Sequence, residues 1–278
     1  MKNLVTGLGL IASALIFNTN VQASSILIDN FSTAQAELVS DTTGVGASSQ
    51  ATGAGILGDY RDIYVEKTID NTGADSGLIT VEVITAGTDR LQVSMENLVT
   101  GFVALTYDGS NFVGDAYDAE TTAPGAMAPP GLGVAVDGLV AGSDSGLGED
   151  FSDFDGFLFD LLSVDQDNPA IINVWTDDAS DGNFVKHSVE VVTSEINFPG
   201  DTEFVSFGSF NGGGSINWER VGAIQALYNV SFDNVNAVAE AQLTLTKIAV
   251  VPEPTVLTMF GAGILALGFA GYRRKEQE

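Results

Sequence analysis

The chain has 278 residues, 37 of them acidic and 10 basic, which gives a formal net charge of -27 at pH 7. This charge repels nucleic acid phosphates and anionic membrane surfaces, so it argues against nucleic acid as a partner. Because 45% of the residues are hydrophobic and none is cysteine, we expect a folded domain stabilised by packing, with no disulfide, no thiolate metal site and no cysteine nucleophile.

Residues 1–23 have the pattern of a secretory signal peptide. Lys2 precedes the uncharged stretch 4–17, and residues 21–23 form a site of the kind that signal peptidase accepts. A buried N-terminal helix is the alternative, but the run lacks an amphipathic pattern. We therefore expect export and cleavage after Ala23.

Residues 24–250 show an apolar pattern of period two, which is typical of strands with one face in a core and one in water. Leu91, Val93 and Met95, for example, alternate with polar side chains. Clusters of Gly, Asp and Asn separate the apolar segments and mark turns. The predicted strands are residues 26–31, 61–68, 81–83, 91–96, 100–107, 157–164, 170–176, 185–192, 203–210, 223–230 and 242–246.

About ten such strands, with no long amphipathic helix between them, predict an all-β fold, an antiparallel β-sandwich of jelly-roll type. We interpret residues 24–250 as one ectodomain, flanked by the signal-peptide helix and by a single C-terminal transmembrane helix. The stretch 121–148, rich in Ala, Pro and Gly, is its one long surface loop. A domain boundary at this stretch is the alternative, but it would leave neither side with a full set of sandwich strands.

Four short stretches resemble the galactose-binding-like jelly rolls of carbohydrate-binding modules, most nearly those of family eleven. They are Phe-Asp-Gly-Phe-Leu at 154–158, Phe-Val-Ser-Phe-Gly-Ser-Phe at 204–210, Trp-Glu-Arg-Val-Gly-Ala-Ile at 218–224 and Val-Ser-Phe-Asp-Asn-Val at 230–235. The resemblance implies a jelly-roll order of strands, with the last stretch as the final strand, and carbohydrate binding. The sequence departs from the family pattern at residues 236–249, which add a further strand.

The C-terminal segment 251–278 combines three elements in a fixed order. Pro252-Glu253-Pro254 comes first, an uncharged apolar run at 256–272 follows, and Arg273-Arg274-Lys275 comes last. As a helix the run would be about 25 Å long, slightly less than the roughly 30 Å of bilayer hydrocarbon. The basic residues would keep their end on the cytoplasmic side.

This arrangement resembles the PEP-CTERM sorting signal of Gram-negative bacteria. The resemblance implies that a membrane-embedded exosortase recognises Pro252-Glu253-Pro254 and processes the tail, which holds the protein in the inner membrane until then. It also implies a final location at the cell surface or in the extracellular matrix. A plain single-span anchor is the alternative.

Enzyme chemistry has little support in the sequence. His187 is the only histidine, it lies in a predicted strand, and no G-x-S-x-G motif is present. We therefore expect neither a Ser-His-Asp triad nor a zinc site of the usual type, and predict that the protein is not an enzyme. Glycoside hydrolysis stays an alternative, because 37 acidic residues place some carboxylate pairs at suitable distances by chance.

Acidic turns are the candidate metal sites, and calcium, which takes six to eight oxygen ligands, is the cofactor they would bind. Neither turn matches an EF-hand loop, and solvated acidic turns are the alternative interpretation. The candidate ligands are Asp150, Asp153 and Asp155 in one turn and Asp177, Asp178 and Asp181 in the other.

Exposed aromatic side chains would stack on sugar rings in a carbohydrate-binding domain. The candidates are Tyr60, Tyr64 and Trp218, whereas Trp175 is expected in the core. We interpret the protein as an exported, non-catalytic surface or matrix protein that associates with exopolysaccharide, with calcium as a bridge. A structural matrix protein that contacts other proteins is the alternative.

Overall fold

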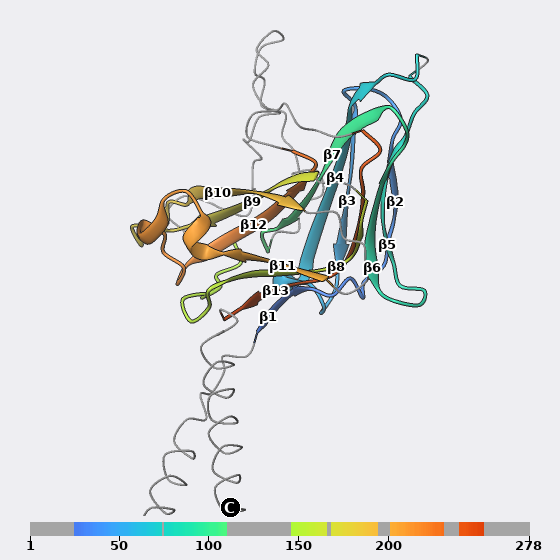
Figure 1. Cartoon of the computed structure of the whole chain (residues 1–278). Coiled ribbons are helices and arrows are strands. Elements are labelled where there is room, and N and C mark those ends of the chain that lie inside the picture. Colours follow the sequence, from blue (N-terminus) through green and yellow to red (C-terminus); the bar gives the residue numbers. More distant parts are fainter. Residues whose placement is uncertain are drawn as a thin grey trace, which may run out of the picture.

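The computed structural model describes residues 25–73, 75–109, 146–165, 168–193, 201–230 and 239–252. Within these ranges every regular element is a strand or a short 3-10 turn. Two antiparallel sheets lie face to face and enclose one main core (Figure 1). The predicted all-β antiparallel sandwich is therefore confirmed.

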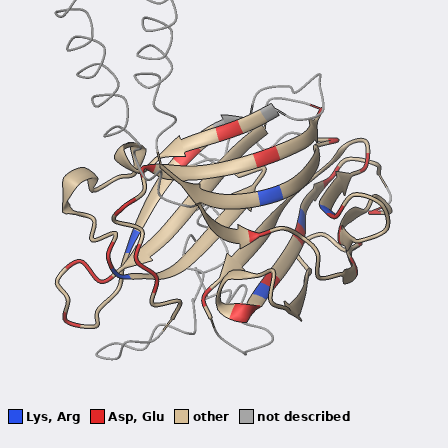
Figure 2. Ribbon diagram, turned by 90° about the horizontal axis from the view of Figure 1, so that it is seen from below, with Lys and Arg blue, Asp and Glu red and all other residues tan. Residues whose placement is uncertain are grey.

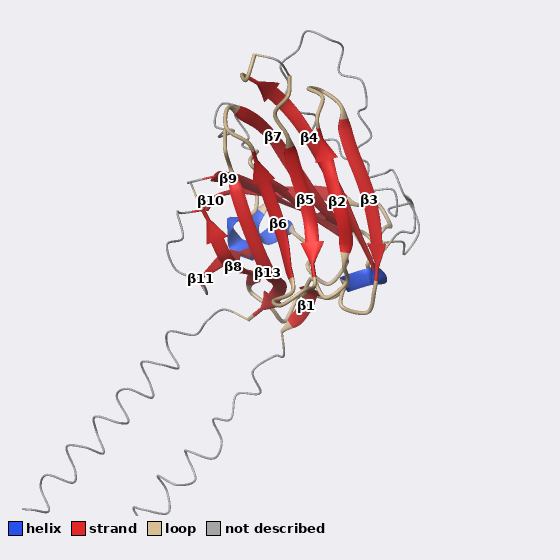
Figure 3. Ribbon diagram, turned by 90° about the vertical axis from the view of Figure 1, so that its right-hand side faces the viewer, coloured by secondary structure: helices blue, strands red, loops and turns tan. Residues whose placement is uncertain are grey.

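Sheet A has seven strands. In spatial order its main path is β11 (Asp201–Ser206), β8 (Gly156–Val164), β13 (Gln242–Val251), β6 (Arg90–Met95), β5 (Ile79–Ile84) and β2 (Gln35–Ser40). β1 (Ile26–Asp29) pairs with β13 beside this path. Figure 3 shows β6, β5 and β2 side by side in this sheet.

Sheet B has six strands. In spatial order they are β10 (Val185–Thr193), β9 (Asn168–Thr176), β12 (Val221–Tyr228), β7 (Val99–Tyr107), β4 (Tyr60–Asp70) and β3 (Gly46–Thr52). In both sheets, strands from before and after the predicted loop 121–148 are neighbours, because β12 pairs with β7 and β13 pairs with β6.

β13 joins the two ends of the described chain. Its first half pairs with β6, and its second half pairs with β1, where Ile26 faces Val250. Register shifts on its β8 side between Thr244 and Lys247 mark irregularities of the kind that bend a strand. Residues 25 and 252 consequently leave the domain close together, at the strands labelled β1 and β13 in Figure 1.

The two predicted terminal helices, at residues 1–23 and 256–272, lie outside the described residues. Within the described ranges, no helix is both long and apolar enough to cross a membrane. Most of the predicted loop 121–148 also lies outside the described ranges.

The core follows the period-two pattern of the sequence. In β5, Ile79, Val81 and Val83 are buried while Thr80 and Glu82 are partly exposed. β7 and β9 differ, since every residue of both strands is buried. Their outward apolar side chains, such as Phe102, Ile171 and Trp175, belong to smaller clusters on the face of sheet B that points away from the main core.

The structure corrects several predicted strands. β2 and β3 were not expected, because Gln-Ala-Glu-Leu-Val-Ser and Gly-Ala-Ser-Ser-Gln-Ala-Thr have few of the β-branched and aromatic residues that signal a strand. The strand expected at 203–210 ends at Ser206, where a 3-10 turn begins whose Gly208 amide is capped by the Ser206 hydroxyl. The strand expected at 26–31 ends at Asp29, because Phe31 has a φ of 54°.

Candidate functional site

Six polar side chains form a continuous row across the outer face of sheet B. The strand register places them opposite one another, one from each strand. Their chain neighbours, such as Ile63, Leu105 and Ile224, belong to the main core, so these six point to the other face. We call them the polar row, and in order from β3 to β10 they are Gln50, Asp62, Thr106, Gln225, Asn173 and Ser188.

Hydrogen bonds link four members of the polar row into a chain. Ser188 Oγ donates to Asn173 Oδ1 at 2.7 Å, and Asn173 Nδ2 donates to Gln225 Oε1 at 3.0 Å. Gln225 Nε2 donates in turn to Thr106 Oγ1 at 3.0 Å. Both amides therefore use their carbonyl as an acceptor and their NH₂ group as a donor, which fixes the orientation of each amide plane.

The other two members, Gln50 and Asp62, are joined by a bond of 3.3 Å from Gln50 Nε2 to Asp62 Oδ2. Apart from the partly exposed Gln50, the row is buried in this structure, with Asn173 and Gln225 at 0% exposure. Buried polar groups need hydrogen-bond partners, and the side-chain bonds provide them. Because these side chains are buried, a ligand could contact them only if the row became exposed.

Apolar clusters with aromatic side chains lie on both sides of the polar row. On one side Tyr64 packs against a cluster that contains Phe102, with the two ring centroids 5.8 Å apart. On the other side Trp175, Ala223 and Phe184 pack together. A band of hydrogen-bonding groups between aromatic surfaces matches the chemistry of sugars, whose hydroxyls need polar partners and whose ring faces are apolar.

Two of the three predicted sugar-stacking residues lie on this face. Tyr60 and Tyr64 alternate along β4 with the inward-facing Arg61 and Ile63, so both point outward with Asp62. The Tyr64 ring lies over β3 at Gly46, where a Cβ atom would collide with the ring. The Tyr64 hydroxyl is hydrogen-bonded to Glu66.

Trp218 lies elsewhere, in an aromatic group at the edge of the main core. Its ring stacks on Phe207 with centroids 3.7 Å apart and an angle of 8° between the planes, and it meets Phe157 and Phe210 edge-on. One ring face is therefore covered by protein. Trp175 is buried as expected, but it packs on the outer face of sheet B and not in the main core.

Asp150, Asp153 and Asp155 do not converge on a common point. Asp150 Oδ1 accepts hydrogen bonds from the hydroxyl and the amide of Ser152, and these bonds hold the pKa of Asp150 below its usual value. Asp153 and Asp155 are exposed. This turn is shaped by bonds from a carboxylate to its own backbone.

The second predicted calcium turn is held by protein donors. Asp177 accepts from the amides of Asp181 and Gly182 and pairs with Arg220 Nε at 3.1 Å. Asp181 accepts from the Asn183 amide. The Arg220 guanidinium therefore already supplies a positive charge to the Asp177 carboxylate.

Asp178 in the same turn anchors a neighbouring loop. It accepts from Thr176 Oγ1 and from the Asn217 amide, and His187 Nε2 lies 2.8 Å from it. The other ring nitrogen, Nδ1, lies 3.0 Å from the Asn211 carbonyl oxygen. His187 thus ties the β9–β10 turn to the loop before β12. In the described part of the chain, no three His, Asp or Glu side chains are grouped to hold a metal ion, and calcium stays a prediction.

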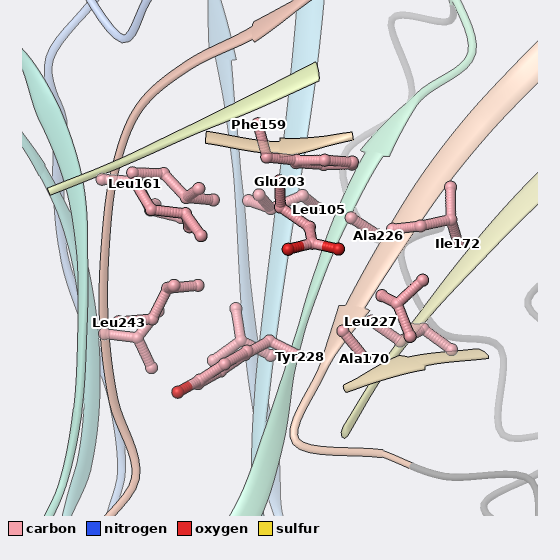
Figure 4. A pocket seen from close by; sticks show the side chains of 15 residues that line it. Leu105, Phe159, Leu161, Ala170, Ile172, Glu203, Ala226, Leu227, Tyr228 and Leu243 are labelled. Atoms are coloured by element: carbon pink, nitrogen blue, oxygen red, sulfur yellow. The ribbon is translucent and has the colours of Figure 1, made fainter. Parts of the chain in front are cut away.

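An apolar cavity of about 50 Å³ lies between the two sheets (Figure 4). Figure 4 shows the Glu203 carboxylate turned into this space among Leu, Ala, Ile and Phe side chains. Burial raises the pKa of Glu203, and no described residue pairs with its carboxylate. The cavity is too small for a sugar ring, since ligand pockets typically enclose about 300 Å³ or more.

Of the predicted sorting and processing residues, only Pro252 lies within the described ranges, where it is half-buried directly after β13. Ala23, Glu253, Pro254, Arg273, Arg274 and Lys275 lie outside them.

The polar row was not found from the sequence. A signal for it does exist, because Asn173 interrupts the apolar run Ile-Ile-Asn-Val-Trp and Gln225 interrupts Ala-Ile-Gln-Ala-Leu. Only the register of strands far apart in the chain shows that these interruptions are aligned.

The geometry defines an antiparallel β-sandwich with a polar row on one outer face. No protein-family model matches the chain, and no curated protein matches it. Among solved structures, it is similar to the family 11 carbohydrate-binding module of the cellulosomal cellulase Lic26A-Cel5E of Clostridium thermocellum. The two are 11% identical, the match covers 82% of this chain and 95% of that chain, and the TM-score is 0.35.

A second similar structure is the family 11 module from Clostridium thermocellum in complex with a β-1,3-1,4-mixed-linked tetrasaccharide. It is 12% identical, covers 79% of this chain and 95% of its own, and has a TM-score of 0.33. Scores this low do not assign a ligand to this chain.

Proposed function

We propose that this domain is a non-catalytic polysaccharide-binding domain whose ligand lies along the polar row of sheet B. The observation that carries the proposal is the alignment of six polar side chains across six strands, between aromatic clusters. With strands about 4.8 Å apart, the row is about 24 Å long. This length suits an oligosaccharide segment better than a single sugar.

The charge of the protein favours a neutral ligand. Acidic side chains outnumber basic ones across the sheets and loops (Figure 2), and Asp62 itself belongs to the row. An anionic polysaccharide would be repelled unless a cation bridged the two. We therefore expect neutral polysaccharides to bind without calcium and anionic ones to require it.

A first experiment measures binding of the exported protein to a panel of neutral and anionic polysaccharides, with the variants Gln225→Leu and Tyr64→Ala. Gln225→Leu breaks the chain of hydrogen bonds, and Tyr64→Ala removes an aromatic surface beside it. We expect each to weaken binding at least about tenfold, equivalent to about 1.4 kcal/mol. Gln92→Leu is the matched control, because Gln92 lies on the outer face of sheet A.

Thermal unfolding of each variant separates loss of binding from loss of fold. Equal affinity of the wild type, Gln225→Leu and Tyr64→Ala for every bound polysaccharide would refute the placement on sheet B. No binding to any member of the panel would favour a matrix protein that contacts other proteins. Release of reducing sugars would instead support the glycoside hydrolase alternative.

We also propose that the protein is exported, sorted by an exosortase and delivered to the cell surface or the matrix. The signal-peptide pattern at 1–23 and the three ordered elements of 251–278 support this address. The intact mass of the protein recovered from the matrix is expected to lack both segments, apart from residues beside the cut. A mature protein that keeps residues 256–272 in a strain with an active exosortase would contradict it.

A further inference from the structure

Lys67 is a buried cation at the end of β4. It follows Val65 and Ile63 on the inward face of the strand, and its side chain has 0% exposure. A buried ammonium is costly unless it is paired and hydrogen-bonded. The atoms around Lys67 Nζ therefore decide how its buried charge is stabilised.

Five oxygen atoms surround Lys67 Nζ. Two are carboxylate oxygens, Asp70 Oδ2 at 3.0 Å and Asp75 Oδ1 at 2.8 Å. Three are backbone carbonyl oxygens, those of Asp41 at 2.6 Å, Gly77 at 2.8 Å and Asp75 at 3.5 Å. We call these five atoms the oxygen cage.

The oxygens of the cage are of the kinds that bind a hard divalent cation, and water would complete the six to eight ligands that calcium takes. An ammonium group has three hydrogens to donate, fewer than the five oxygens, and its single positive charge is smaller than the two negative charges of the carboxylates. Calcium sites in proteins are built from carboxylate and backbone carbonyl oxygens contributed by turns. In this structure the Lys67 ammonium group lies among the oxygens where a metal ion would bind.

Hydrogen bonds from neighbouring residues hold both carboxylates of the cage, of which Asp70 is buried and Asp75 is half exposed. Asp70 accepts from the Thr72 hydroxyl and amide through Oδ1 and from the Gly77 amide through Oδ2, while Thr43 Oγ1 donates to Asp75. The pKa of Asp70 is held well below its usual value, chiefly by the Thr72 hydroxyl, and that of Asp75 is lowered chiefly by Lys67. Both carboxylates are thus ionised at neutral pH.

The backbone of Lys67 joins the same two turns. Its amide donates to Ser40 Oγ at 2.9 Å, and its carbonyl accepts from the Gly44 amide at 2.8 Å. One residue therefore ties the β2–β3 turn to the β4–β5 turn, through its main chain and through its ammonium group.

We propose that Lys67 is a built-in cation in a calcium-type site, which closes this end of the sandwich without a metal ion, so that removing its side chain leaves a site for calcium. The proposal is independent of polysaccharide binding on sheet B. It also requires that any calcium dependence of the wild-type protein arises at another place.

The test compares the full exported protein with Lys67→Ser in EDTA and in millimolar CaCl2, by thermal unfolding and by calorimetric titration with CaCl2. Between the two conditions the Tm of the wild type is expected to change much less than that of Lys67→Ser. Lys67→Ser is expected to unfold roughly 5 to 15 °C lower in EDTA and to regain most of this loss in CaCl2. Adding Asp75→Asn should abolish the calcium response.

Lys247→Ser is the matched control, because Lys247 pairs with Asp160 at 2.8 Å on the partly exposed surface of sheet A. It should show neither the loss nor the calcium response. A folded Lys67→Ser that binds no calcium, or a calcium response of equal size in the wild type and Lys67→Ser, would overturn the proposal.

Lys67→Ala gives a second test should Lys67→Ser not fold in EDTA. Propylammonium replaces the Cγ, Cδ, Cε and Nζ atoms that this variant lacks, and both it and CaCl2 should restore folding of Lys67→Ala. If neither ligand restores folding of either variant, the cage is not a cation site that a free cation can occupy, and the inference fails.

Discussion

At the scale of single residues, the main core encloses an ion pair. Arg61 Nη1 lies 2.8 Å from Asp29 Oδ2, and both side chains have 0% exposure. Every polar group of the pair has a partner: Arg61 also donates to Gln35 and to the Thr33 carbonyl, and Asp29 accepts from Tyr107. Burial raises the pKa of Asp29 although Arg61 lowers it, so its charge depends on the pair.

Breaking this pair from one side is expected to be costly. Arg61→Met leaves the Asp29 carboxylate buried without its counter-ion, and we expect a loss of about 3–5 kcal/mol in the free energy of unfolding, measured by urea denaturation. Arg90→Met is the control, because Arg90 is partly exposed and bonds only to the Thr88 carbonyl among the described residues. Its effect should stay within about 0.5 kcal/mol.

A double variant distinguishes a coupled pair from two separate contributions. Arg61→Met with Asp29→Asn removes both charges, so it should lose clearly less than the sum of the two single variants. Additive losses would show that the charges act independently and would contradict the interpretation of the pair.

At the scale of elements, the edge strand β11 turns a carboxylate toward the apolar space between the sheets. Glu203 faces a cavity of about 50 Å³ that is lined by residues such as Leu161, Ile172 and Leu243 (Figure 4). An edge strand with an inward charge resists pairing with a second sheet. The same charge weakens the packing between β11 and the core.

The destabilising effect of Glu203 on the packing of β11 depends on pH, because its carboxyl group titrates. Burial raises the pKa in the folded protein, whereas the unfolded chain titrates near the ordinary value of about 4.3. At a pH between these two pKa values, Glu203 is more protonated in the folded protein than in the unfolded chain. The free energy of unfolding therefore falls as pH rises through the folded pKa. Glu203→Leu should remove this fall.

Because leucine also fills apolar space, Glu203→Leu should stabilise the protein at pH 7 by about 1 kcal/mol. Urea denaturation at pH 4 and at pH 7 measures both effects. Glu82→Leu on the outer face of β5 is the control, since it changes the same charge away from the cavity. A variant with the same pH dependence as the wild type would contradict this role of Glu203.

The sequence was informative about elements with one polar and one apolar face. β5, β6 and β13 were predicted because Val81, Leu91 and Leu243 alternate with polar residues. β2 and β3 were missed because their side chains are small or polar and their strand state depends on pairing with β5 and β4. For the same reason, neither the polar row nor the oxygen cage could be predicted. The row depends on the register of strands far apart in the chain, and the cage depends on two turns that meet in space.

At the scale of the whole molecule, the two ends of the described chain and the proposed ligand face belong to different sheets. The ends of the described chain meet at β1 and β13 in sheet A, while the polar row lies on the outer face of sheet B. A ligand on sheet B would therefore not contact the strands that lead to the terminal segments. We therefore expect that the proposed binding and the proposed sorting can be altered separately.

The net charge of -27 makes the proposed binding testable through its salt dependence. A neutral polysaccharide would be held by hydrogen bonds and stacking, which salt does not screen, so its affinity should change less than about twofold between 50 and 500 mM NaCl. An anionic polysaccharide should not bind at low salt, because the repulsion is then least screened. It should bind only when calcium is added, and EDTA should reverse this binding.

Affinity electrophoresis of the exported protein in gels that contain either polysaccharide compares these salt, calcium and EDTA conditions side by side. A neutral ligand whose affinity falls steeply with salt would show that charge, and not the polar row, provides the binding energy. Tight calcium-free binding of an anionic polysaccharide would contradict the charge argument, because such a ligand would have to overcome the repulsion of the whole acidic surface.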